Sequence, residues 1–429
     1  MCLDLLARWR EERLQNIAEL RTSNVDKKSV EDEQPVRLCN YVDVYKNDKI
    51  TMILDFMTVT ASEAQTYRFN LRVDDVVITK DSESPDDIGI PALVVETSPD
   101  LVCGYHLTIL RPYKDKAVGS YLAYALCSRL SAYQFYLAAN GVTRFGLTYQ
   151  GTKNIRIALP PPDEQRRIAA FLDWKTGQID ALIARKQALL EMLKEKRLAV
   201  ITQAVSRGLN PVAPLRDSDI PWLDKVPEHW GTRRLKFTVT LRNEKMDAEE
   251  STLDYMGLEH IESWTGNRIE DESASSEGIT TRFLEDDVLF GKLRPYLAKV
   301  YLAEKEGMAT TEALILTSDA VLFPKFLKYL LISEKFIDIV SGTTYGSKMP
   351  RANWRTIGSI PIPLPSRNEQ QQITAFLDSE TTKLSALEAK VLDVIEKLQE
   401  YRTALITATT TGKIDVRNTL TNTNIKTIN

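Results

Sequence analysis

The chain has 429 residues, 43% of them hydrophobic, and a net charge of −4 at pH 7. This composition is typical of a soluble globular protein of two to four domains. No apolar run approaches the ~20 residues of a membrane span, so we expect a cytoplasmic protein without a membrane partner. The four cysteines form no CxxC pair and the three histidines are scattered, so no metal site and no disulfides are expected. The negative charge means that nucleic-acid binding would need local basic patches or a partner.

Residues 1–156 mix short β-rich runs, such as DDVVIT and YHLTIL, with a helical stretch from Ser120. They are predicted to form a first globular domain. The segment 157–209 follows, beginning with a Pro-rich extended run and continuing as a helix. Asp163 is placed as the N-cap, Glu164 favours the first turn, and Gly208 is a plausible stop. Such a helix is on the order of 60 Å long, and this segment is the only one with a net positive charge.

Residues 210–361 again mix β-rich runs, such as DDVLFGK and EALILT, with a helical stretch from Lys325. They are predicted to form a second globular domain. The segment 362–415 is a second helix, with Asn368 as the expected N-cap and Gly412 as the expected stop. Residues 416–429 are expected to be a flexible tail.

The two helical segments are copies of one another. The stretch from Ile157 to Thr202 aligns without a gap with the stretch from Ile362 to Thr407, and nearly half of the positions are identical. Between these anchors the two domains diverge almost completely. Self-similarity of this kind indicates that one half of the molecule repeats the other, and we expect a pseudo-two-fold arrangement.

Both helices carry apolar residues at heptad spacing, most cleanly in the second one. Sustained heptads favour a coiled coil, and the simplest partner of each helix is the other. The fold class is therefore predicted as α+β, with two mixed domains joined by an antiparallel coiled coil. The predicted interface residues are Ile179, Leu182, Leu189, Leu193, Val200, Leu384, Leu387, Val391, Val394, Leu398, Tyr401 and Leu405.

The motif order PLP…EQ..I..FLD before a heptad helix occurs twice, each time behind a divergent domain. In this the chain resembles the specificity subunit of type I restriction-modification systems. The segments DIPWLDKVPEHWGTRRLKF, DDVLFGKLRPY and GTTYGSKMPRANW resemble parts of that family's target-recognition domain. The resemblance covers nearly the whole chain.

The resemblance implies that each domain reads one half of a bipartite, asymmetric site in double-stranded DNA. It implies that the coiled coil sets the half-site spacing and docks two modification (methyltransferase) subunits, which a nuclease-translocase restriction subunit joins. The specificity subunit itself catalyses nothing and binds no cofactor or metal. S-adenosylmethionine belongs to the modification subunit, and ATP and Mg belong to the restriction subunit.

Base readout needs donors and acceptors on a loop that faces a groove, and phosphates need cations. The best candidates lie near the end of a strand and in the last loop of each domain. Trp354 and Tyr345 in that loop are expected to pack in the core. The predicted DNA-binding residues are Lys80, Arg144, Tyr149, Gln150 and Lys153 in the first domain, and Lys292, Arg294, Tyr296, Ser347, Lys348, Arg351 and Asn353 in the second.

Two other classes of protein compete with this interpretation. A DNA-modifying enzyme, either a fused methyltransferase or a metal nuclease, would need catalytic residues. The sequence has no phosphate-binding P-loop and no Asn/Asp-Pro-Pro-Tyr/Phe tetrapeptide, and Asp86 with Glu96 lacks the lysine of a nuclease site. A structural coiled-coil scaffold with two binding heads would not need to repeat the PLP…EQ entry segment.

Overall fold

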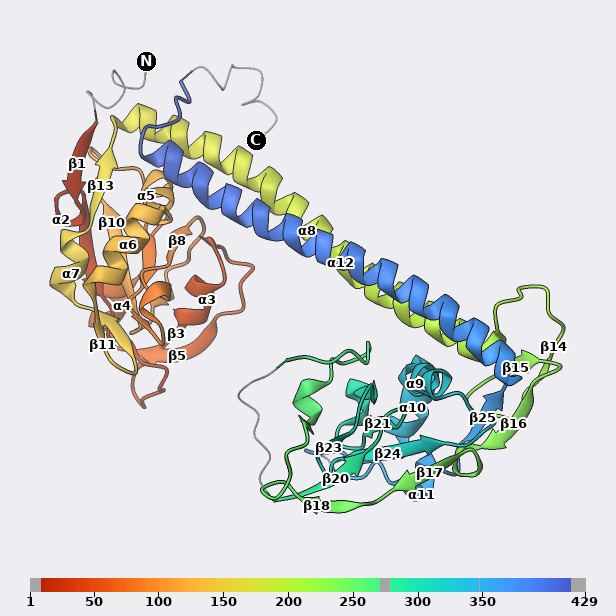
Figure 1. The fold of residues 1–429 in the computed structure, drawn as a ribbon. Helices are drawn as coiled ribbons and strands as arrows, with labels where there is room; N and C mark the ends of the chain where they lie inside the picture. Colours follow the sequence, from red (N-terminus) through yellow and green to blue (C-terminus); the bar gives the residue numbers. More distant parts are fainter. Residues whose placement is uncertain (1–8, 271–277, 347, 418–429) are drawn as a thin grey trace. The chain divides into compact units, whose positions relative to one another are not determined.

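The computed structural model describes residues 9–270, 278–346 and 348–417. The chain forms two compact units, residues 1–186 with 393–429 and residues 187–392. Each unit holds one mixed domain, the beginning or the end of the first long helix, and the opposite part of the second (Figure 1). The boundaries between units thus cut through the two predicted helical segments. Most of the predicted tail, from residue 418 onward, lies outside the described residues.

The described residues of the first unit form one five-stranded sheet, two three-stranded sheets and one strand pair. Strand order is β2-β10-β6-β8-β4 in the five-stranded sheet, β5-β3-β9 and β11-β12-β7 in the three-stranded sheets, and β1-β13 in a pair. Helix α5 packs on β6 and β8 of the largest sheet and carries buried Tyr121 and Leu122. The bounds are β1 Arg10–Arg13, α2 Leu14–Ile17, β2 Ala18–Thr22, β3 Gln34–Cys39, α3 Tyr41–Tyr45, β4 Lys49–Ile50, β5 Met57–Ala61, α4 Glu63–Phe69, β6 Val76–Thr79, β7 Asp81–Ser82, η1 Pro85–Asp87, β8 Pro91–Val94, β9 Leu101–Cys103, β10 Leu107–Pro112, α5 Gly119–Leu126, α6 Arg129–Ala138, β11 Ala139–Gly141, β12 Phe145–Leu147, α7 Tyr149–Asn154 and β13 Arg156–Leu159.

The second unit repeats this plan with different strands. Its four-stranded sheets have the orders β17-β24-β21-β22 and β18-β20-β23-β19, and two pairs are β14-β15 and β16-β25. Helix α9 covers β21, β22 and β24, and its residues Phe326, Leu327 and Leu330 are fully buried. The bounds are β14 Leu215–Asp217, β15 Lys225–Pro227, β16 Gly231–Arg234, η2 Leu235–Phe237, β17 Val239–Arg242, β18 Lys245–Asp247, β19 Tyr255–Met256, η3 Leu258–His260, β20 Ile279–Phe283, β21 Val288–Gly291, η4 Pro295–Leu297, β22 Val300–Leu302, β23 Gly307–Ala309, β24 Ala313–Ser318, α9 Pro324–Ile332, α10 Glu334–Gly342, α11 Trp354–Ile357 and β25 Pro361–Leu364.

The two long helices are α8, Pro162–Arg207, and α12, Arg367–Thr410. The predicted N-caps are wrong, because Asp163 and Asn368 already lie inside the helices. Helix α12 is capped instead by Ser366, whose Oγ accepts a hydrogen bond from the Glu369 amide at 3.3 Å. Helix α8 begins with a proline, whose fixed φ suits the first helical position. The predicted stops are confirmed, since Gly208 and Gly412 adopt φ of 71° and 73°, a region that glycine enters without strain.

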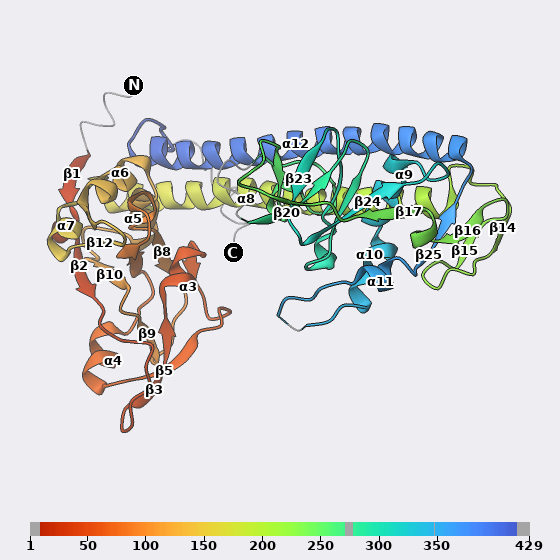
Figure 2. The ribbon, with the colours of Figure 1, turned by 60° about the horizontal axis from the view of Figure 1, so that its bottom comes forward.

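Helices α8 and α12 run side by side, and within each unit the beginning of one packs on the end of the other (Figures 1 and 2). In the first unit, Arg402 donates to Asp180 at 2.9 Å. In the second, Arg197 donates to Ser385 at 2.9 Å and to Glu388 at 2.7 Å. Within each unit the pairing is therefore antiparallel, as predicted.

One of the two predicted heptad positions is wrong by one residue. Leu182, Leu387, Val394 and Tyr401 are exposed by 39%, 43%, 37% and 56%. The residue after Val394, Ile395, is buried, and Ile183, Glu388 and Arg402 after the other three are half-buried. Arg197, at the equivalent position of α8, is 5% exposed. A heptad pattern of apolar residues does not predict a buried arginine. An arginine can be buried between two helices when it forms an ion pair across them. The other predicted position is buried at Ile179, Leu193, Leu384, Val391 and Leu405 and half-buried at Val200 and Leu398. Leu189, which shares the position of Leu182, is half-buried.

A buried glutamine attaches each domain to the start of its helix. Gln165 is fully buried, and its Oε1 accepts a hydrogen bond from the Val118 amide at 2.8 Å. Its Nε2 donates to the carbonyls of Lys116 at 2.9 Å and Pro160 at 2.8 Å. The second unit has the same three bonds: Gln370 accepts from the Phe323 amide and donates to the carbonyls of Val321 and Pro365. The repeated EQ motif therefore fixes the entry to each helix.

The end of the partner helix is bound by each domain in the same way. The Arg129 amide at the start of α6 donates to Thr407 Oγ1 of α12 at 3.1 Å. The Glu334 amide at the start of α10 donates to Thr202 Oγ1 of α8 at 3.3 Å. Each domain is thus bound to both helices. Among the described residues, no helix is long and apolar enough to cross a membrane.

Candidate nucleic-acid interface

In both domains a buried aspartate shapes the turn that leads into the strand before the candidate residues. Asp287 accepts hydrogen bonds from the Leu284 amide at 2.8 Å, from Arg242 Nε at 2.7 Å and from Thr317 Oγ1 at 2.5 Å. Strand β21 follows at once and ends at Gly291. Its direction, and so the position of the loop after it, is fixed by this turn.

The matching aspartate of the first domain is Asp75, which precedes β6. It accepts from the Arg72 amide at 2.9 Å and from Arg111 at 2.8 and 2.6 Å. The residues before the two aspartates, Asp74 and Asp286, both have positive φ, 77° and 67°. The two domains therefore share a backbone frame, although a different strand supplies the arginine in each.

In the second domain the structure brings the predicted strand end and the last loop together. The Arg294 amide donates to the Pro350 carbonyl at 2.8 Å, and the Ala352 amide donates to the Lys292 carbonyl at 2.9 Å. Leu293 also forms a β-bridge with Arg351. The two loops, distant in sequence, thus make one continuous surface.

The side chains on this surface differ in their exposure and in whether they form ion pairs. Arg294 is exposed, has the uncommon left-handed φ of 51°, and forms no ion pair with another described residue. Lys292 and Lys348 also lack an ion pair among the described residues, and Tyr296 is 48% exposed. A non-glycine residue held at positive φ is uncommon. These groups are available to phosphates or base edges.

Two other predicted residues already have partners. The Arg351 guanidinium donates to Glu312 at 3.1 and 3.3 Å, and this hydrogen bonding raises the pKa of Arg351. Asn353 caps α11 by accepting from the Arg355 amide at 2.8 Å, so its side-chain oxygen is occupied. Ser347 lies outside the described residues.

Tyr345 lies on this surface, contrary to the prediction from the sequence. It was expected in the core, but 61% of its side chain is exposed, and its backbone pairs with Arg351 at 3.0 and 3.2 Å. An exposed aromatic beside unpaired cations is a common element of nucleic-acid surfaces. Gly342 and Gly346, three residues before and one residue after this tyrosine, favour a loop and were the available signal. Trp354, by contrast, packs against the core as expected.

In the first domain the same two regions also meet. Lys80 follows β6, and its carbonyl accepts from the Leu147 amide at 2.7 Å. The hairpin of β11 and β12 carries exposed Arg144 close to its tip, and β12 pairs with β7. Lys80 and Arg144 form no ion pair with another described residue.

Helix α7 follows this hairpin and carries the remaining candidates. Tyr149 is 49% exposed, and the Lys153 ammonium lies 4.4 Å from its ring centroid. Gln150 is exposed on the same helix. The first domain therefore presents cations and an aromatic ring, as the second does, but mostly on a hairpin and a helix instead of on two loops.

Neither enzymatic alternative gains support from the geometry. Among the described residues, no group of three or more His, Cys, Asp or Glu side chains is placed to hold a metal ion. Glu96, half of the pair considered for a nuclease, accepts a hydrogen bond from the Met52 amide at 2.8 Å, a structural role that accounts for it.

Known proteins share both the sequence features and the fold. The specificity subunit of the type I restriction enzyme EcoDI from Escherichia coli is 24% identical over 61% of this chain and 63% of its own length. The specificity subunit of EcoKI, from strain K12, is 23% identical over 80% of this chain and 75% of its own length. The chain spans 63%, 47% and 64% of three of the curated relatives, less than two thirds of each.

Two solved structures share the fold. A chain from a study of complex assembly and conformational transition in a type I R-M system covers 96% of this chain and 98% of its own, with a TM-score of 0.69 and 16% identity. The HsdS subunit from Thermoanaerobacter tengcongensis covers 95% and 97%, with a TM-score of 0.51 and 18% identity.

The model of the type I restriction modification DNA specificity domain matches residues 7–192 and 227–397. These two matches coincide with the two halves of the internal repeat, and together they cover most of the chain. The chain therefore belongs to the family of type I restriction modification DNA specificity domains.

Proposed function

We propose that this chain is the non-catalytic DNA-recognition subunit of a type I restriction-modification complex, in which each domain reads one half of a bipartite, asymmetric site. The observation that carries the proposal is the pair of dissimilar surfaces built on one duplicated frame. The frame gives both domains the same attachment to the helices through Gln165 and Gln370. The surfaces differ in loops and residues, so they would read different bases.

The family membership supports the further proposal that two modification subunits bind along α8 and α12 and supply S-adenosylmethionine. A restriction subunit would then supply the ATP- and Mg-dependent chemistry. The exposed residues Leu387, Val394 and Tyr401 follow each other at heptad spacing on α12, outside the seam. Single exposed apolar residues need no explanation, but a row of them at the edge of a coiled coil favours protein binding.

Replacing Arg294 by alanine should weaken recognition of one half-site by about 10- to 100-fold, the effect of losing one good base or phosphate contact. Methylation rates on duplexes carrying single-base changes in each half-site would measure this. Arg233→Ala is the matched control, because Arg233 is an exposed arginine on β16 of the same unit. Equal losses at both half-sites would show that Arg294 supports folding or assembly.

The double variant Val394→Ser and Tyr401→Ser should reduce the affinity for the modification subunit about tenfold or more, because apolar anchors dominate such interfaces. Sedimentation of the mixed subunits would measure the stoichiometry and affinity. Leu137→Ser with Tyr133→Ser, on α6, serves as the control, because it removes apolar side chains that are even more exposed, 64% and 62%, from a helix of the first domain. If both double variants bind normally, the row on α12 is not a docking surface.

A further inference from the structure

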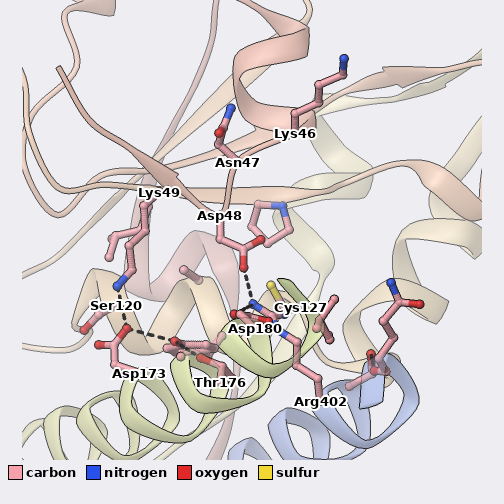
Figure 3. Close-up of a pocket in the computed structure, with 18 residues that line it drawn as sticks. Lys46, Asn47, Asp48, Lys49, Ser120, Cys127, Asp173, Thr176, Asp180 and Arg402 are labelled. Carbon is pink, nitrogen blue, oxygen red and sulfur yellow. Dashed lines mark hydrogen bonds and ion pairs between the residues drawn. The ribbon is translucent and has the colours of Figure 1, made fainter. Parts of the chain in front are cut away.

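A short loop of the first domain touches both long helices at a second point, away from the glutamine junction. Lys49 at the start of β4 donates to Asp173 of α8 at 2.8 Å. The preceding Asp48 forms an ion pair with Arg402 of α12, which also donates to Asp180 of α8 at 2.9 Å (Figure 3). These contacts cross a cavity of about 780 Å³ between the domain and the helices.

The residues that make these contacts are also held by neighbouring side chains. Asp173 also accepts from Tyr124 Oη at 3.0 Å, and that hydroxyl lies 3.2 Å from Thr176 Oγ1. The Arg402 side chain is only 21% exposed. Its burial alone would lower the pKa of Arg402, but Asp48 and Asp180 outweigh that effect and raise it. Arg402 is therefore charged under all physiological conditions, and its two carboxylate partners compensate its burial.

The second unit keeps the inner part of this arrangement and lacks the outer part. Tyr329 and Lys325 of α9 both donate to Asp378, at 2.8 Å each. Arg197, the counterpart of Arg402, has its described partners Ser385 and Glu388 on α12 alone. No loop comparable to residues 46–49 reaches Arg197 from the second domain within the described residues. The outer contact is thus a property of the first domain.

Two attachment points constrain a domain more than one does. Gln165 and Asp180 are fifteen residues apart on α8, or about 22 Å at 1.5 Å per residue. The glutamine junction, the Arg129–Thr407 hydrogen bond and the Tyr124–Asp173 hydrogen bond already hold the first domain on the helices. The contacts of Asp48 and Lys49 add resistance to a tilt of the domain about the Gln165 end of α8. A tilt of about 10° moves a point 20 Å away by about 3.5 Å, which is the rise of about one base pair. A contact that prevents such a tilt therefore prevents a displacement of the domain by about one base pair along the DNA.

We propose that Asp48, Lys49 and Arg402 form a strut that fixes the angle of the first domain on the helices and so restricts the spacer length between the two half-sites. These are positioning residues, since their described partners, Asp173 and Arg402, lie on the long helices and are not candidate DNA-binding residues. The inference rests on the proposed function, because it presupposes a split recognition site.

The test uses the chain in complex with its modification subunits. After the site is mapped, methylation rates are compared on duplexes with the natural spacer and with one base pair added or removed. The double variant Asp48→Asn with Lys49→Gln should lower the preference for the natural spacer about fivefold or more while keeping both half-site sequences. Lys49→Arg with native Asp48 should retain the preference. Raising the salt concentration should lower it in the native chain and not in the double variant.

Asp26→Asn with Lys28→Gln is the matched control, because it removes the same two charges from a loop of the same domain, where they pair with each other at 3.9 Å. Asp48 is 67% exposed and Lys49 49%, so the double variant should fold, and thermal unfolding checks this. Asp48→Asn alone should act in the same direction. A native complex that modifies no split site would overturn the proposed function. A native complex that selects its spacer, together with a folded double variant that selects it equally well, would overturn the strut alone.

Discussion

Replacing Asp287 by alanine should destabilise the second domain by about 3–5 kcal/mol, the cost of removing one partner of a largely buried ion pair. Asp287 is 1% exposed, and its carboxylate binds Arg242, Thr317 and the Leu284 amide. The variant removes the acceptor of Arg242 Nε, Thr317 Oγ1 and the Leu284 amide, while Glu244 still accepts from Arg242 Nη1. Hydrogen exchange of the amides of β17, β21 and β24 would measure the free energy of opening of this sheet.

Glu285→Ala is the matched control, because it removes an exposed acid two residues away. It should change the opening free energy by a few tenths of a kcal/mol at most. Exchange in the first unit should be unaffected by either variant. Equal protection in the Asp287 and Glu285 variants would contradict the role that we assign to the buried turn, and with it our account of how the loop at Lys292 and Arg294 is positioned.

Replacing Gln370 by leucine should destabilise the junction of the second domain with α12 by about 2–4 kcal/mol. The side chain is fully buried and makes three hydrogen bonds with backbone groups. Leucine has a similar volume, so the main loss is that one amide and two carbonyls remain buried without partners. Gln370→Glu can still accept from the Phe323 amide but cannot donate. The stability of its junction should therefore fall between those of the native chain and the leucine variant.

The neighbouring Gln371 is exposed, so Gln371→Leu makes the same substitution without touching the junction. Urea unfolding of both variants, followed by exchange at the start of α12, would separate the two positions. DNA recognition by the second domain should be lost at a lower temperature in the Gln370 variant only. If the two leucine variants unfold alike, the repeated glutamine does not fix the domain to its helix.

The sequence was informative wherever the two halves repeat. The helices, their glycine stops and the entry segments could be predicted because the same residues recur at a fixed offset. The apolar heptads predicted the antiparallel pairing, but they did not predict which residues occupy the second buried position of the seam. Leu387, Val394 and Tyr401 fit a heptad as well as the true seam, and only the partners of Arg197 and Arg402 decide between the two registers.

The recognition surfaces could be located from the sequence but not described in detail. That Lys292 lies beside Ala352 depends on a hydrogen bond between loops sixty residues apart, for which no local pattern exists. The pairing of Arg351 with Glu312 and the exposure of Tyr345 have the same origin. The loop at Asp48 gave no signal at all, because a polar loop whose partners are on distant helices has the same composition as one in solvent.

The exchange of helix ends between the units has a consequence for synthesis. The second unit, residues 187–392, is complete before the chain is finished, whereas the first unit needs residues from 393 onward. Leu405 and Ile406 belong to the same buried cluster as Ile168, Leu172 and Ile179. At roughly 5–20 residues per second, the nascent first unit waits on the order of 10–40 s with that apolar surface uncovered. The domain made first is therefore completed last, and a chain that stops early loses the packing at its own beginning.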